Sequence, residues 1–146
     1  MPHWIVYHPP NAYTDDESKD ALAKAITDFY VGVGLPAFYV VVNFLEVPQT
    51  GFYVGGVRRG PGDKPFIRFT INHVAHNYPD DDKVLRAAGD QFNQLLTPLL
   101  KGKGYDWEFH IGETDRRLWK TNEFTPPERR TDAERLWVKE NRPVAY

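Results

Sequence analysis

The segment from Phe38 to Leu45, FYVVVNFL, decides the fold class of this chain. It is a nearly unbroken run of aromatic and β-branched residues, which is typical of a β-strand. A strand that is buried on one face alternates apolar and polar residues, and this run does not. The segment therefore predicts a strand covered on both faces, as in parallel pairing.

An earlier strand and a helix precede this segment and complete a β-α-β unit. Residues 3–8 read as a short strand that ends at two prolines. Residues 14–17 fit a capping box, in which Thr14 caps the helix and Glu17 reaches back. Apolar residues follow at helical spacing at Ala21, Leu22, Ala25, Ile26 and Phe29.

The same order of elements repeats about 64 residues later. Residues 66–71 read as a strand, residues 79–82 open a second helix, and residues 105–111 read as the closing strand. Between the units, residues 52–56 predict a short hairpin or bulge at Gly55-Gly56. Two right-handed β-α-β units predict an α+β fold, with one mixed sheet and both helices on one face.

The chain is interpreted as a single domain over residues 1–146, with units at about 2–50 and 65–113 and a polar extension over 114–146. Helices on one face leave the other sheet face bare, so we expect oligomerisation through the sheet. The extension either anchors on a neighbour through its large apolar residues or is partly mobile. Those residues are Leu118, Trp119, Phe124, Leu136, Trp137 and Tyr146.

Composition excludes several classes of protein. A formal net charge of -2 argues against a nucleic-acid binder, which usually carries a basic face. The apolar runs are too short to span a bilayer, and the first residues lack a signal-peptide pattern. The expectation is a cytoplasmic protein without membrane contact. The absence of cysteine excludes thiolate chemistry and disulfides.

Pro2 is the first candidate catalytic residue. A proline in the second position normally allows Met1 to be trimmed, which leaves a secondary amine at the head of an apolar strand. An α-amino group titrates at about 7.7–8.0 in water, and burial lowers its pKa. Such an amine could act as base or acid at neutral pH.

Two histidines, His73 and His76, lie between a predicted strand and the second helix. As a metal pair they lack a third ligand nearby in the sequence, so no metal site is predicted. Ser18 is the only serine and falls in the first turn of a helix, which argues against a Ser-His-Asp hydrolase.

Five pieces in order resemble the tautomerase superfamily, most closely its cis-3-chloroacrylic acid dehalogenase branch. The pieces are Pro2, residues 23–28 of the first helix, Val42-Asn43-Phe44-Leu45-Glu46, Gly55-Gly56-Val57, and Gly112-Glu113. The resemblance covers roughly residues 2–126. It implies a homotrimer of double-unit chains that works without a cofactor on a small molecule, with the terminal proline in a cavity.

The resemblance also assigns roles to side chains. Pro2 matches the proline that moves a proton to or from carbon. A substrate-binding histidine of the family falls on Tyr30, and its pair of carboxylate-binding arginines falls on His73 and His76. Its water-activating tyrosine falls on His110, or on Phe109 if Trp107 sets the register. Its water-activating glutamate falls near Thr121, with Glu123 two residues beyond.

These replacements change the expected chemistry. An arginine pair binds a carboxylate at any pH, whereas a histidine pair does so only when protonated. Arg117, with Arg116, is the candidate replacement cation for substrate binding. The favoured function is a keto–enol tautomerase of a small carbonyl or carboxylate compound. The alternatives are a dehalogenase or hydratase of small unsaturated acids, and a non-catalytic ligand-binding or assembly module.

Overall fold

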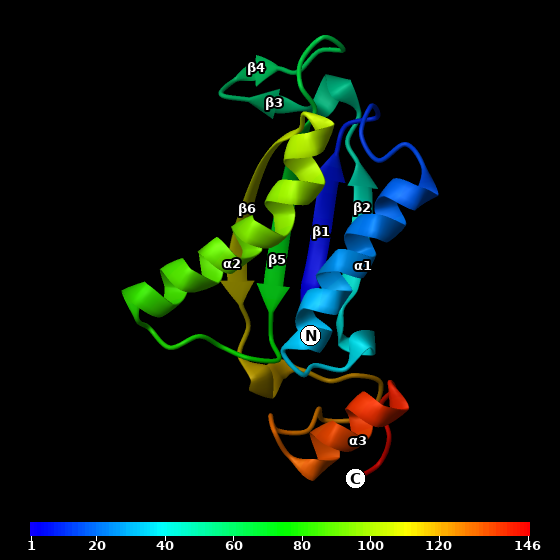
Figure 1. Cartoon of the computed structure of the whole chain (residues 1–146), viewed down its shortest axis with the longest axis vertical. Helices are drawn as coiled ribbons and strands as arrows, with labels where there is room; N and C mark the ends of the chain where they lie inside the picture. Colours follow the sequence, from blue (N-terminus) through cyan, green and yellow to red (C-terminus); the bar gives the residue numbers. More distant parts are fainter.

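The centre of the structure is one mixed four-stranded sheet, seen in a computed structural model of residues 1–146 (Figure 1). Its strands are β1 (His3–His8), β2 (Val41–Glu46), β5 (Phe66–His73) and β6 (Asp106–Glu113), in the order β2-β1-β5-β6. The pairs β1/β2 and β5/β6 are parallel, and β1/β5 is antiparallel. Each parallel pair is one β-α-β unit, so the predicted α+β fold is confirmed.

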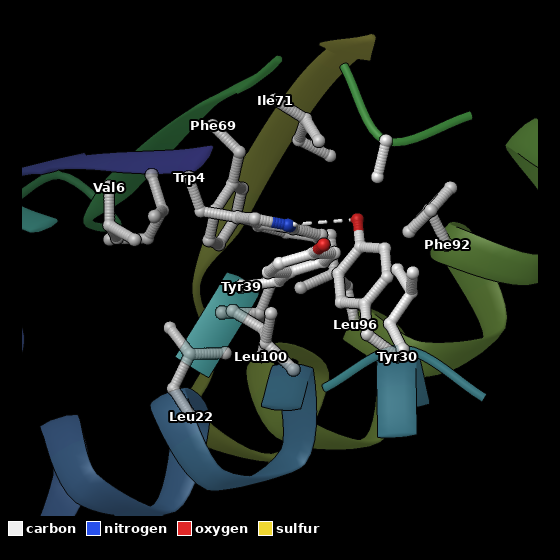
Figure 2. Close-up of a cluster of buried hydrophobic side chains, with 14 of the residues drawn as sticks. Trp4, Val6, Leu22, Tyr30, Tyr39, Phe69, Ile71, Phe92, Leu96 and Leu100 are labelled. Atoms are coloured by element: carbon white, nitrogen blue, oxygen red, sulfur yellow. Dashed lines mark hydrogen bonds between the residues drawn. The ribbon is translucent and has the colours of Figure 1, made fainter. Parts of the chain in front are cut away.

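Helices α1 (Asp16–Gly32) and α2 (Asp82–Leu100) lie on the same face of the sheet (Figure 1). Side chains along β1 and β5 alternate between buried and half-buried, because successive residues of a strand point to opposite faces. The buried set packs on Leu22 and Ile26 of α1 and on Phe92, Leu96 and Leu100 of α2. Figure 2 shows Leu22, Phe92, Leu96 and Leu100 among the side chains of this cluster. Burying one such side chain contributes about 1.5–3 kcal/mol.

The first helix begins one residue later than its sequence predicts. The side chain of Asp15, not Thr14, accepts a hydrogen bond from the backbone N–H of Ser18 at 2.6 Å. A carboxylate is the stronger acceptor at a helix N-terminus, because it also interacts with the helix dipole. In the same way, Asp81 caps α2 by accepting from Lys83 and Val84.

The segment that decides the fold class divides into two parts. Ala37–Tyr39 form the short 3-10 helix η1, and the strand β2 starts only at Val41. β2 is one of the two edge strands of the sheet, and one of its faces is open in the single chain, where Leu45 is 46% exposed. The predicted double coverage was therefore wrong for the isolated chain: Phe38 and Tyr39 are apolar because they pack on the C-terminal extension.

The two units are joined by a small excursion from the sheet. The 3-10 helix η2 (Gln49–Gly51) leads into the hairpin of β3 (Tyr53–Val54) and β4 (Val57–Arg58). Its two turn residues, Gly55 and Gly56, have φ of 60° and 78°. A two-residue turn with both residues at positive φ matches the twist of a hairpin and favours glycine at both positions.

The extension folds back onto its own chain. After the 3-10 helix η4 (Arg116–Leu118), it forms helix α3 (Asp132–Glu140), which lies at the end of the sheet where the chain begins (Figure 1). Trp137 is fully buried, with ring centroids 5.8 Å from Phe38 and 6.1 Å from Tyr39. Trp119 packs on Tyr39 at 4.7 Å. A further 3-10 helix, η3 (Lys101–Lys103), links α2 to β6.

None of the helices combines the length and the apolar character needed to cross a membrane.

Candidate functional site

A cavity of about 260 Å³ opens at the end of the sheet where β1 begins. Because β1 and β5 are antiparallel, with His3 opposite Asn72, the start of β1 meets the end of β5 at this edge. Helix α1 also ends here, and α3 lies alongside (Figure 1). The topology therefore brings Pro2, Tyr30, His73 and His76 to the wall of one cavity.

Pro2 is buried at this wall, directly before β1. Its carbonyl oxygen accepts a hydrogen bond from the N–H of Val41 at 3.0 Å, which ties the start of the chain to the edge strand. Burial, assisted by the charge of Arg116, lowers the pKa of the preceding Met1 amine to about 4. The surroundings of the chain start therefore disfavour a protonated amine.

Tyr30 and His73 form a buried polar pair in the cavity. The Tyr30 hydroxyl accepts a hydrogen bond from Nε1 of Trp4 at 3.0 Å, drawn as a dashed line in Figure 2, and lies 2.7 Å from Nε2 of His73. Burial raises the pKa of Tyr30, so its hydroxyl keeps the proton.

The His73 ring is neutral at physiological pH. Burial lowers its pKa to about 4, and the charges of the amino terminus and of His76 act in the same direction. The Tyr30 hydroxyl already accepts from Trp4, so its own proton is available to Nε2 of the neutral ring. The Nδ1 atom then carries the ring proton and remains a donor.

The rest of the wall comes from the end of α1 and the residues just after it, from the loop after β5, from helix α2 and from the extension. His76 is exposed and stacks edge-on against Tyr78 at a centroid distance of 5.7 Å. The extension contributes Arg129 and Arg130. These two arginines cannot be identified from the sequence, because only the folding of the extension across the sheet end brings them to the same cavity as Pro2.

The remaining predicted site residues lie outside this cavity. His110 points to the open face of the sheet, where its Nδ1 is 2.6 Å from Nη2 of Arg68. Phe109, its register alternative, faces the helices and contacts Phe92. Arg117 is exposed and bound to Asp115 at 2.5 Å.

Two more predicted positions lie in the extension. Glu123 is exposed in the turn closed by the Thr121–Phe124 bridge. Arg116 is turned inward, and its guanidinium donates to the backbone carbonyl of Ala75 at 2.9 Å and to that of Pro126 at 2.9 Å. It therefore fastens the extension to the loop after β5.

The cavity combines a desolvated chain start with neutral and cationic hydrogen-bond donors, and no carboxylate lines it. No three His, Cys, Asp or Glu side chains anywhere in the chain are arranged to hold a metal ion. Such a wall can stabilise negative charge that develops on an oxygen of a small molecule.

Comparison with known proteins defines the class. Residues 1–142 match the family described as "Putative oxalocrotonate tautomerase enzyme". This chain belongs to that family, and its fold is that of the tautomerase superfamily.

Two solved structures are similar over the whole chain. A probable enzyme from the thermophilic fungus Aspergillus fumigatus is 40% identical, with a TM-score of 0.88, over 100% of this chain and 98% of the other. Native RhCC from Rhodococcus jostii RHA1 is 39% identical, with a TM-score of 0.88, over 99% of each chain.

The fold is shared more widely than the sequence. A member of the cis-3-chloroacrylic acid dehalogenase family is 14% identical, with a TM-score of 0.68, over 95% of this chain and 97% of the other. At that identity the likeness concerns the fold alone. No curated protein matches the chain.

Proposed function

We propose that this chain is a cofactor-independent keto–enol tautomerase, in which Pro2 acts as base and acid after removal of Met1. The observation that carries the proposal is the burial of Pro2 in the wall of a cavity that also holds the Tyr30–His73 pair. Membership of a family described as a tautomerase supports the isomerase class.

The reaction needs one group that moves a proton and others that hold the charge left behind. The neutral amine of Pro2 takes a proton from the carbon next to a carbonyl, and the C–H electron pair forms the carbon–carbon double bond of an enolate. Return of the proton to another atom completes the isomerisation. Transfer by one positioned group contributes about 10²–10⁴-fold to the rate.

The charge that develops on the enolate oxygen is stabilised by donors of the wall. The available donor of a neutral His73 is Nδ1–H, with the Tyr30 hydroxyl behind the ring at Nε2. The buried surroundings support a low pKa for the Pro2 amine, as they do for the Met1 amine that precedes it. Such an environment supports a base that is unprotonated at neutral pH.

The proposal is tested with phenylenolpyruvate, whose conversion to the keto form is followed by ultraviolet absorbance. Pro2→Ala is expected to lower kcat/KM by about 10²-fold or more, because a primary amine replaces the ring nitrogen and loses its fixed position. Pro10→Ala, at an exposed turn position, is the matched control and should retain the native rate.

Intact-mass measurement accompanies the kinetic test. A retained Met1 would leave the Pro2 nitrogen in an amide bond without basicity. Retention of Met1 in an active protein, or equal rates for the native and Pro2→Ala chains, would remove the proposal and favour a ligand-binding or assembly module.

A further inference from the structure

We propose that Arg130, in the C-terminal extension, is the residue that binds the carboxylate of an acidic substrate in this cavity. The inference deepens the proposed function by naming an acid as the substrate class. It rests on that function for the reaction, but not for binding.

The charges along the cavity wall point to an anion. No Asp or Glu lines the cavity, while two guanidinium groups do. Arg129 is already engaged: its Nη1 contacts Oε1 of Glu134 at 3.2 Å, and its Nη2 donates to the carbonyl of Val33 at 3.0 Å. Arg129 thus ties the extension to the end of α1, and its charge is balanced within the protein.

Arg130 differs from its neighbour in this respect. Its guanidinium forms no ion pair with any carboxylate and no hydrogen bond within the chain, although it lines the cavity. A positive charge at a wall without acidic residues is available to a ligand. An arginine binds a carboxylate through two parallel N–H···O bonds, independently of pH.

The backbone of Arg130 is held firmly even though its side chain is free. Its φ is 64°, a left-handed conformation that few residues other than glycine adopt. The Arg130 N–H donates to Oε2 of the buried Glu134 at 2.7 Å, and its carbonyl accepts from Nη1 of Arg135 at 3.2 Å. These bonds fix the point from which the guanidinium reaches the cavity.

The two residues that the proposal needs lie at different depths in the cavity. Pro2 is buried, and Arg130 is exposed. An acid bound with its carboxylate at Arg130 would place its adjoining carbon atoms deeper, on the side of Pro2.

The test measures binding without turnover. Isothermal titration calorimetry compares 3-phenylpropanoate with its uncharged amide, 3-phenylpropanamide, on four chains: native, Arg130→Gln, Arg130→Lys and Arg86→Gln. Arg86 is an exposed arginine of α2 that pairs with Asp82 and does not line the cavity. Circular dichroism and thermal unfolding establish that every variant folds.

Arg130→Gln is expected to weaken binding of the acid by about 10- to 100-fold, the loss expected for a hydrogen bond to a charged group. Arg130→Lys should fall between, because a lysine keeps the charge but not the paired donors. Arg86→Gln should bind as the native chain does, and affinity for the amide should not change in any variant.

Equal affinity of the native and Arg130→Gln chains for the acid would overturn the inference. So would a native chain that binds no acid up to about 10 mM, or an equal loss for acid and amide. Arg130-dependent binding of the acid in a chain that never converts phenylenolpyruvate would keep this inference and overturn the proposed tautomerase function. Turnover of phenylenolpyruvate together with acid binding that does not depend on Arg130 would keep the proposed tautomerase function and overturn this inference.

Discussion

The Tyr30 hydroxyl joins a core residue to a cavity residue. It accepts from Nε1 of Trp4, a side chain with no exposed surface, and lies 2.7 Å from Nε2 of His73. One oxygen therefore satisfies a buried donor and orients an imidazole. A site residue placed in this way contributes to stability and to activity together, because buried polar groups are costly without partners.

Tyr30→Phe is predicted to lower both the stability and the activity of the protein. The indole N–H of Trp4 would lose its partner while remaining buried, which costs about 1–3 kcal/mol. Urea unfolding measures this change, and conversion of phenylenolpyruvate should slow by about tenfold or more as the His73 ring loses its orientation. Tyr53→Phe, in the exposed hairpin, is the control and should change neither. An unchanged unfolding midpoint for Tyr30→Phe would contradict this account of the pair.

His73 predicts a pH dependence of stability. Its pKa in the folded chain is about 4, below the ordinary 6.5, chiefly because the ring is buried. The unfolded chain binds the proton more tightly, so protonation of His73 favours unfolding. The stability that the neutral His73 provides is therefore fully present above pH 6.5 and is lost as the pH falls toward 4. The pKa difference between the folded and unfolded chains corresponds to roughly 3 kcal/mol in the free energy of unfolding.

Urea unfolding between pH 7.5 and 4.5 checks this prediction. The native chain should lose stability over the interval, and His73→Gln, which keeps an acceptor for Tyr30, should lose less. The Met1 amine, with its pKa lowered from 8.0 to about 4, acts in the same direction in chains that retain it, so only the difference between variants reports on His73. His3→Gln, on the open sheet face, should keep the native slope; a His73→Gln slope equal to it would be inconsistent with a buried neutral ring.

At the scale of elements, helix α3 holds in place the part of the cavity wall that the extension supplies. The Glu134 side chain is only 6% exposed, and its two oxygens bind the Arg129 guanidinium and the Arg130 N–H. This carboxylate fixes the left-handed turn that carries both arginines. Trp137, one turn later on the same helix, seats α3 against Tyr39.

Glu134→Gln is predicted to loosen that turn without removing a cavity cation. An amide keeps one acceptor but not the charge, so the free energy of unfolding should fall by about 1–3 kcal/mol. Affinity for 3-phenylpropanoate should fall less than in Arg130→Gln. Glu140→Gln, which removes a more exposed carboxylate at the end of α3, is the matched control. Native stability in Glu134→Gln would mean that α3 is held by its apolar contacts alone.

The sequence predicted the elements better than the site. Strands and helices of both units follow from local periodicity. The grouping of Pro2, Tyr30, His73 and His76 follows only from the resemblance to the superfamily, because periodicity does not show that β1 and β5 are antiparallel. Arg129 and Arg130 could not be found in this way, since their position depends on the packing of α3 through Trp137. The alternation along β6 indicates that His110 lies on the open face of the sheet. His110 shares that face with Asp106 and Glu108, whereas the core face holds Trp107, Phe109 and Ile111.

On the scale of the whole molecule, one sheet face has no cover within the chain. The half on β1 and β2 carries Ile5, Tyr7, Val41 and Leu45 around the hydrogen-bonded pair His3–Asn43, while the half on β5 and β6 carries Arg68, Thr70, Glu108 and His110. Exposed apolar side chains that gather on one uncovered face favour an interaction surface there. We propose that copies of this chain associate through this face, as a homotrimer according to the resemblance to the superfamily.

Leu45→Arg is predicted to dissociate that assembly. Leu45 is 46% exposed on the open face, and a buried arginine without a partner at an interface is strongly unfavourable. Size-exclusion chromatography with light scattering should give three times 16.9 kDa for the native chain and 16.9 kDa for the variant.

Leu118→Arg tests specificity, because Leu118 is 79% exposed but lies in η4, away from the sheet. A monomeric native chain, or dissociation by both variants, would show that the open sheet face is not the interface. All the lining residues of the cavity described above belong to one chain. A Leu45→Arg monomer that still binds 3-phenylpropanoate would therefore separate assembly from ligand binding.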